Sequence, residues 1–330
     1  MTDGMQAIPD SELTTAEKYR AFAEVEAHGL SPTYDALALG VADDPEVVAL
    51  IDELPVPKRQ VNLVFSSARL LSAPMSGYGG FRDWFVRHWS EVRDIALTHA
   101  TQTNEPRRAA VLLPVLASLP GPLALIEVGA SAGLCLYPDR YSYRYDDGPP
   151  LHPASGPSPV LLSCATSGPV PLPTAVPTVS WRAGIDLNPL DVRSDDDVRW
   201  LSALTWPEHE DRRERLTAAV AIARQDPPRI ERGDLNELLP ALAAEAPKDA
   251  TLVVFHTAVL LYLDRAARQR FVNTVTGLDA VWLSNEGDDV TPGIAERLPR
   301  RSETPAFVLA RDGEPVAFTQ PHGASIEWLG

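Results

Sequence analysis

A glycine-rich segment near the middle of the chain carries the strongest chemical signal. An apolar run from Leu123 leads to Glu127, and Gly129, Ser131 and Gly133 follow at alternate positions. Glycine lets the main chain turn tightly and approach a ligand closely, and a helix after such a turn offers unpaired N–H groups. Two chemistries use this pattern. One is the binding of a nucleotide or of S-adenosylmethionine, and the other is the G-x-S-x-G elbow of an α/β-hydrolase, with Ser131 as the nucleophile.

Acidic residues follow the next two predicted strands. Asp186 ends the first of them, and Asp234 comes directly after the second. In dinucleotide-binding folds an acidic residue at such a strand end binds the ribose, so we expect Asp186 to bind ribose and Asp234 to lie near adenine. An acidic residue before a helix is also a common N-cap. The predicted cofactor-binding residues are Glu127, Gly129, Ala130, Ser131, Gly133, Asp186, Leu187, Gly233, Asp234 and Leu235.

Polar side chains also end two later predicted strands. His256 ends an apolar run, and Asn285 and Glu286 end the following one. The carboxyl ends of parallel strands face the ligand crevice, so we predict His256 as a general base or acceptor contact and Asn285 and Glu286 as residues that orient the acceptor. The alternative is a histidine hydrogen-bonded for structural reasons. His256, Glu286 and His322 have no spacing typical of a metal site, so we predict none.

Two polar motifs precede the glycine-rich segment. They are Lys58-Arg59-Gln60-Val61-Asn62 and Thr101-Gln102-Thr103-Asn104-Glu105. Their amides suit the binding of a polar ligand, and helix capping by Thr or Asn is the alternative. The residues that we expect to contact the substrate, close the site and exclude water are Asn62, Gln102, Asn104 and His322.

A serine hydrolase remains an alternative at this point. Its nucleophile needs a carboxylate and a histidine, and Asp264 or Asp288 with His322 gives the order Ser, Asp, His after Ser131. A hydrolase normally has antiparallel strands before the elbow, whereas the segment before Leu123 has only helical patterns. The sequence therefore favours nucleoside binding. A non-catalytic ligand-binding protein is the third hypothesis.

The elements around these residues predict a fold of two parts. A capping box at Thr14-x-x-Glu17 opens the helical part. Further helices are predicted there over 58–72, 79–99 and 105–119. Strands are then predicted over 123–128, 178–185, 229–232, 250–256 and 280–284, with a closing hairpin of 305–310 and 315–319 around an Asp-Gly turn. Helices are predicted between them over 130–137, 195–203, 208–225, 235–245 and 264–276.

Alternating strands and helices predict an α/β fold with a mostly parallel, Rossmann-like sheet and a C-terminal antiparallel hairpin. We expect a disordered tail over 1–10, an all-helical cap over 11–120 and the α/β domain over 121–330. Residues 145–178 are rich in Pro, Gly and Ser, and we interpret them as a long loop or a small inserted hairpin. That insertion would explain why Asp186 lies well beyond the usual ~20 residues after the glycine-rich loop.

Composition narrows the possible partners. The chain has 330 residues, 45% of them hydrophobic, and a formal net charge of −16, which argues against nucleic acid and anionic membranes. Cys135 and Cys164 are too few for a disulfide framework or a four-thiolate zinc site. The first residues do not resemble a signal peptide, and no apolar stretch reaches the ~20 residues that span a bilayer. We expect a soluble, cytoplasmic protein; its oligomeric state stays open.

Several motifs occur together along nearly the whole chain. They are Lys58-Arg59-Gln60 with Asn62, Thr101 to Glu105, Glu127 to Leu134, Asp139-Arg140-Tyr141, Gly184 to Pro189, Trp206-Pro207, Phe255-His256, Ser284 to Gly287 and Pro321-His322-Gly323. With them the chain resembles a bacterial family classified as a domain of unknown function. Cys135 departs from the family pattern, which usually has Asn there.

The resemblance implies a class I methyltransferase-like fold with a helical N-terminal domain, and it implies no reaction. Fold likeness alone does not fix function. Our hypothesis from the sequence is methyl transfer from S-adenosylmethionine to a small polar acceptor molecule.

Overall fold

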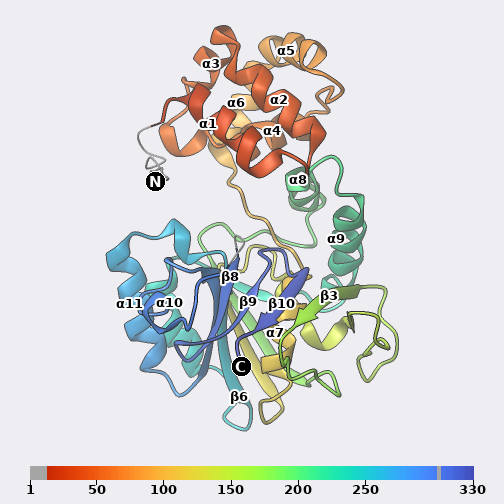
Figure 1. The fold of residues 1–330 in the computed structure, drawn as a ribbon, viewed down its shortest axis with the longest axis vertical. Helices are drawn as coiled ribbons and strands as arrows, with labels where there is room; N and C mark the ends of the chain where they lie inside the picture. The colour runs from red at the N-terminus through yellow and green to blue at the C-terminus, as the bar shows by residue number, and fades with distance from the viewer. Residues whose placement is uncertain (1–12, 303–305) are drawn as a thin grey trace. The chain divides into compact units, whose positions relative to one another are not determined.

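The computed structural model describes residues 13–302 and 306–330. The tail predicted over 1–10 lies outside these residues. The chain divides into two compact units, which Figure 1 shows in ribbon form. The helical unit comprises the residues up to Thr103 together with Asp196–Arg213, and the sheet unit comprises Asn104–Asp195 together with Glu214–Gly330.

The helical unit is built from short helices around an aromatic core. Its helices are α1 (Thr15–Ala21), α2 (Pro32–Ala42), α3 (Pro45–Ile51), α4 (Val61–Leu70), α5 (Tyr78–Arg87), α6 (Trp89–Thr98) and α8 (Asp195–Leu204), with a π-helical turn over Phe22–Ala27 and a 3-10 turn over Val56–Lys58. The capping box of Thr14 and Glu17 is confirmed. The rings of Tyr19 and Tyr34 both pack against buried Phe65, which anchors α4 in the centre of this unit.

Two helices fall on the other side of the predicted boundary. Helix α7 (Arg108–Leu116) lies in the sheet unit, although the sequence analysis assigned it to the helical part. Helix α8 lies in the helical unit, although it follows the first strands in the chain. The boundary between the units also falls within α9 (Glu210–Ala223). The chain therefore leaves and re-enters each unit, an arrangement that local sequence patterns do not reveal.

The predicted mixed α/β fold with a large, mostly parallel sheet is confirmed. In the described residues ten strands form one sheet in the order β2-β3-β10-β9-β8-β7-β6-β1-β4-β5. The parallel core consists of β1 (Leu123–Val128), β4 (Val179–Asp186), β5 (Arg229–Arg232), β6 (Thr251–Thr257) and β7 (Val281–Gly287). Every residue of β1 is buried, as expected for a central parallel strand covered on both faces.

Antiparallel and short parallel strands extend this core. Strands β8 (Phe307–Arg311) and β9 (Glu314–Thr319) form the predicted hairpin beside β7, and β10 (Ser325–Trp328) pairs with β9. The interpretation of residues 145–178 as a loop or hairpin is wrong. Strand β3 (Leu161–Ser167) crosses this segment and pairs in parallel with β2 (Ser142–Tyr145) and with β10.

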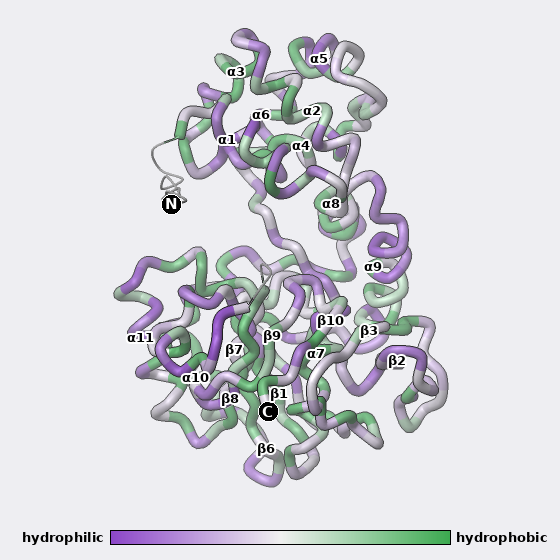
Figure 2. Tube along the Cα trace, viewed as in Figure 1, coloured by the Kyte–Doolittle hydropathy of each residue, from purple (hydrophilic) through white to green (hydrophobic). Residues whose placement is uncertain are grey.

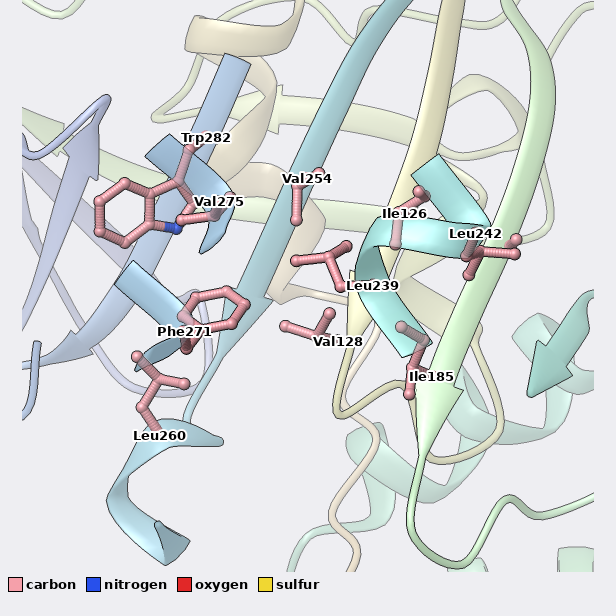
Figure 3. Packing of buried hydrophobic residues seen from close by; sticks show 11 residues of the cluster. Ile126, Val128, Ile185, Leu239, Leu242, Val254, Leu260, Phe271, Val275 and Trp282 are labelled. Atoms are coloured by element: carbon pink, nitrogen blue, oxygen red, sulfur yellow. The ribbon is translucent and has the colours of Figure 1, made fainter. Parts of the chain in front are cut away.

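Helices α10 (Leu235–Ala244) and α11 (Arg265–Thr276) cover one face of the parallel core. Figure 3 shows the hydrophobic side chains that join them to the strands, including Ile126, Val254, Phe271 and Trp282. Figure 2 shows that hydrophobic residues run along the central strands, whereas α9 begins with a hydrophilic stretch. In residues 13–302 and 306–330 no helix is both long and apolar enough to cross a membrane.

Candidate functional site

The glycine-rich loop lies at the point where the strand order reverses. Among the five strands of the parallel core the spatial order is third, second, first, fourth, fifth, so β1 pairs with β4 on one side and with β6 on the other. In open α/β sheets, ligands bind in the crevice outside the carboxyl ends of the strands at this switch point. The N–H groups of Gly129 and Ala130 both donate to the carbonyl of Ile185, which fixes the loop to the end of β4.

The helix predicted over 130–137 is wrong. The loop leads instead into two 3-10 turns, Leu134–Leu136 and Pro138–Arg140. The N–H group of Leu134, the first residue of these turns, donates to the side chain of Asn104, which precedes β1 in the chain. Asn104 Oδ1 lies 2.8 Å from the Leu134 nitrogen. Pro138 provides no N–H to continue a helix. The loop therefore has no helix N-terminus of the kind that binds phosphate groups.

The loop glycines face protein side chains. Gly129 has φ +72°, and a Cβ there would overlap Val259 in the segment after β6. Gly133 also has φ +72°, and its Cβ would lie 2.8 Å from Pro228 Cγ. Glycine is thus required at both positions by backbone conformation and by close packing. Val259 lies against Gly129 in this structure.

Asp186 lies beside the glycine-rich loop, as the sequence predicted for the end of the second parallel strand. Its Oδ2 accepts the Ser131 N–H at 2.8 Å and its Oδ1 accepts the Asn188 N–H at 2.8 Å. The next side chain, Leu187, is 66% exposed. A half-buried carboxylate and an exposed apolar side chain therefore stand next to each other at the end of β4.

Asp234 has the role of a helix cap. Its carboxylate accepts the Asn236 N–H at 2.7 Å and so begins α10 at Leu235. The Gly233 N–H donates to the Asp186 carbonyl, which ties the end of β5 to the end of β4. These contacts give Gly233, Asp234 and Leu235 structural roles. The contact with adenine that the sequence analysis predicts for this segment stays a prediction.

His256 is the centre of a buried hydrogen-bonded network. Its Nε2 accepts the indole N–H of Trp282 at 3.1 Å, so its Nδ1 carries the proton and donates to Glu286 Oε1 at 2.7 Å. The ring is fully buried. Both nitrogens are therefore engaged within the protein, and this geometry does not support His256 as a general base or acceptor contact.

Glu286 organises the segment that follows β6. Besides His256, its Oε1 accepts the N–H groups of Val259 and Leu260 at 2.8 and 3.1 Å. This carboxylate thus positions Val259 against Gly129. Neighbouring Asn285 accepts a hydrogen bond from Thr319 and is also buried. Neither residue reaches the surface in this structure, so a direct contact with an acceptor stays a prediction.

The other face of the sheet holds a residue that the sequence analysis missed. Arg108, at the start of α7, is 7% exposed and donates to the carbonyls of Pro321 and Thr257 and to Thr257 Oγ1. Glu127 is 2% exposed on the same face, and its Oε2 has no hydrogen-bond partner in the described residues. Burial raises the pKa of Glu127 well above its ordinary value, while the Arg108 guanidinium opposes that rise.

The remaining predicted residues have structural contacts. Asn104 holds Leu134, and adjacent Glu105 forms a buried ion pair with Arg215 at 2.7 Å. In the helical unit, Asn62 accepts the Trp206 indole N–H at 2.8 Å. Gln102 belongs to the helical unit, and the substrate contacts predicted for it and for Asn62 stay predictions.

His322 lies in the loop between β9 and β10. Its carbonyl accepts a hydrogen bond from Arg107, and its own N–H donates to Gln320 Oε1. No group of three or more His, Cys, Asp or Glu residues in the described chain is arranged to hold a metal ion.

We expect Gly129→Ala to destabilise the protein by more than about 2 kcal/mol, because strain from the positive φ adds to overlap with Val259. Gly293→Ala is the matched control, since Gly293 has φ +82° with open space around it. Urea unfolding of both variants and of Gly129→Ala/Val259→Ala measures the difference. Equal losses for Gly129→Ala and Gly293→Ala, or no recovery in the double variant, would contradict the packing argument.

Glu127→Gln should be more stable than the wild type at pH 8 by about 1–3 kcal/mol, because the neutral amide avoids the cost of burying an ionisable carboxyl. The pKa of Glu127 is raised above 4.5 in the folded chain. Between the unfolded and folded values the folded chain holds a proton that the unfolded chain has lost, so stability falls as pH rises. The advantage of the variant should therefore shrink toward pH 5. Exposed Glu296→Gln is the control, and a Glu127→Gln protein no more stable than wild type at pH 8 would refute this account.

Comparison with known proteins gives one match. Neither the curated proteins nor the solved structures yield a match to this chain. A bacterial family, described as uncharacterized protein conserved in bacteria (DUF2332), matches residues 16–328. This range includes the glycine-rich loop, Asp186, and the Arg108 and Glu286 networks. The chain belongs to the DUF2332 family.

Proposed function

We propose that the sheet unit binds S-adenosylmethionine at the carboxyl ends of β1 and β4 and transfers its methyl group to a small polar acceptor. The observation that carries this proposal is the pair of Asp186 and Leu187 beside the glycine-rich loop. Asp186 contacts the loop through Ser131, and Leu187 presents an apolar side chain to solvent.

The chemistry of this pair fits a nucleoside. A carboxylate at the end of the second parallel strand accepts hydrogen bonds from ribose hydroxyls in related α/β folds. Carboxylate oxygens carry two lone pairs each, so an aspartate that accepts backbone N–H groups, as Asp186 does, can also accept a hydroxyl. Leu187 supplies an apolar surface for the face of a base. Hydroxyl recognition and base contact thus come from consecutive residues.

The same loop disfavours nucleotides that carry phosphate. Phosphate binding at a glycine-rich loop relies on N–H groups at the start of a helix. Here no α-helix follows the loop, and Asn104 accepts the Leu134 N–H. Asp186 adds an acidic side chain beside the loop, which raises the cost of a nearby anion. A nucleoside bearing a positively charged sulfonium suits these surroundings better than a dinucleotide.

When bound, S-adenosylmethionine would supply an electrophilic methyl group to the acceptor, with the sulfur keeping the electron pair of the C–S bond and the acceptor proton passing to solvent. The protein residues bind and orient. Asp186 would hold the ribose and Leu187 would contact the base, while Glu286 fixes the segment of Val259 against Gly129 of the loop. His256 has no free nitrogen with which to take the acceptor proton.

We expect S-adenosylhomocysteine to bind the full chain with a micromolar Kd in isothermal titration calorimetry. Asp186→Asn should weaken this binding at least about tenfold, because it removes a charged acceptor for ribose hydroxyls. Asp264→Asn is the matched control, since Asp264 also accepts a backbone N–H before a helix. No binding by a folded wild-type protein, or equal binding by both variants, would overturn the assignment.

Transfer is tested with S-adenosylmethionine that carries a labelled methyl group, in the presence of a small-metabolite extract. If a small molecule gains the label with the wild type and not with the Asp186→Asn variant, the protein is a methyltransferase. Binding without any labelled product would favour the non-catalytic alternative.

Ser131 provides the discriminating test for a serine hydrolase. Its φ of +53° resembles the strained turn of a nucleophile elbow, but the helix that completes the elbow is replaced by 3-10 turns. We expect a fluorophosphonate probe to leave the protein unlabelled, with wild type and Ser131→Ala giving the same signal by mass spectrometry. Labelling of the wild type that disappears in Ser131→Ala would instead establish the hydrolase.

A further inference from the structure

The segment that follows β6 covers the bare face of Gly129. The missing side chain of a glycine is the feature that lets a ligand approach the main chain of such a loop closely. At this position, however, a Cβ would lie 1.8 Å from Val259 Cγ2. The space that Gly129 leaves open for a close approach is therefore filled by another side chain of the same unit.

Backbone strain marks the residue before Val259. Ala258 has φ +55°, a left-handed conformation that is uncommon and strained for a residue with a Cβ. Its N–H donates to the Asn285 carbonyl at 3.1 Å, which fixes it beside the end of β7. Strained conformations persist only where the surrounding contacts impose them, and they are concentrated at ligand clamps and switch segments. The position of Val259 therefore needs contacts that hold it in place.

Glu286 supplies these contacts. Its Oε1 accepts the N–H groups of Val259 and Leu260 at 2.8 and 3.1 Å, and the ring N–H of His256 at 2.7 Å. Its Oε2 is buried and has no hydrogen-bond partner in the described residues. The hydrogen bonds between Glu286 and the segment after β6 thus end on a single oxygen atom. A change of charge on this one side chain weakens all of them together.

The part of the segment that can move is short. Leu260 is fully buried in the hydrophobic cluster that joins α10 and α11 to the sheet. Ala258 is tied to Asn285 through its N–H. Val259 lies between these two anchors and is half-buried. A local rearrangement of Ala258 and Val259 is therefore enough to withdraw the Val259 side chain, and Leu260 stays in the core.

The glycine-rich loop has supports of its own. The N–H groups of Gly129 and Ala130 both donate to the Ile185 carbonyl at the end of β4, at 2.8 and 3.1 Å. These bonds do not involve the segment after β6. The loop can therefore keep its shape while Val259 moves away from it.

We propose that Ala258 and Val259 form a gate beside the glycine-rich loop. In the closed state, as in this structure, Val259 covers Gly129 and Glu286 holds the Val259 N–H. In the open state Val259 withdraws and the ligand reaches Gly129. Strain at Ala258 opposes the closed state, the Glu286 hydrogen bonds favour it, and a ligand that binds only the open state shifts the balance.

This inference rests on the proposed function, and it concerns access to that site. A gate has a kinetic signature that differs from that of a binding-site wall. A ligand that binds only the open state associates at a rate proportional to the open fraction. A side chain that contacts the bound ligand affects mainly the rate of dissociation.

We expect Val259→Ala to raise the association rate constant of S-adenosylhomocysteine about tenfold, because the loss of two packed methyl groups weakens the closed state by roughly that factor. The dissociation rate constant should stay unchanged. Surface plasmon resonance on the immobilised full chain measures both. Val290→Ala is the matched control, since this half-buried valine follows β7 and lies against Gly287. It should change neither constant.

Glu286→Gln tests the gate without a ligand. The neutral amide keeps the size of the side chain and weakens the hydrogen bonds to the segment. We expect the amides of Val259 and Leu260 to exchange with deuterium at least about tenfold faster, while those of 253–255 in β6 stay as protected as in the wild type. Asp146→Asn is the control, because Asp146 accepts the Thr166 N–H far from the loop in sequence. Near-ultraviolet circular dichroism verifies the fold of each variant.

The outcomes separate the gate from the proposed function. Equal association rate constants for wild type and Val259→Ala, or a change confined to dissociation, overturn the gate and leave ligand binding in place. Exchange that does not rise in Glu286→Gln, or that rises equally in β6, also overturns the gate. If no folded protein binds S-adenosylhomocysteine, the proposed function is overturned, and the exchange result alone decides whether Ala258 and Val259 open.

Discussion

The hydrogen bonds of the buried Arg108 guanidinium hold together one face of the candidate site. The guanidinium joins the start of α7 to the end of β6 through Thr257 and to the loop after β9 through Pro321. A buried arginine must find acceptors for its donors, and here backbone carbonyls of segments distant in the sequence supply them. Gly323 belongs to the same junction, because any side chain there would overlap the Arg107 carbonyl. Removing the guanidinium would therefore loosen three segments at once.

The opposite face depends on a second buried charge. Glu286 accepts from His256 and from the backbone after β6, and it thereby holds Val259 against Gly129. On the other face Asn104 holds the end of the glycine-rich loop through the Leu134 N–H. The loop is thus held from both sides, by Val259 that Glu286 Oε1 positions through its backbone N–H and by Asn104 that accepts the Leu134 N–H. Such a loop has a fixed shape before any ligand arrives, which lowers the ordering cost of binding.

Local sequence patterns were sufficient to predict the bounds of the central strands, and they were insufficient to predict the structure of the segments that connect these strands. β1 and β5 begin and end at the predicted residues. An apolar run between Pro122 and Gly129 defines β1, whereas β5 has a single apolar residue, Ile230, between charged neighbours. The helix predicted over 130–137 failed because Asn104 accepts the N–H that would open it, a contact 30 residues away in sequence. β3 was missed because its alternating exposure, in a segment rich in Pro and Ser, becomes a strand only through pairing with β2 and β10.

Position at a strand end predicted the location of site residues better than their roles. Consecutive residues of a strand face opposite sides of the sheet, so His256 and Thr257 enter different environments although both end β6. His256 meets Trp282 and Glu286, which occupy both of its nitrogens. Glu127 shares the face of Thr257, where a guanidinium arrives from Arg108, 149 residues away from Thr257, and no local signal marks it. The face of the sheet thus decides which partners a strand-end residue meets: both ring nitrogens of His256 are engaged, whereas Glu127 Oε2 has no hydrogen-bond partner in the described residues.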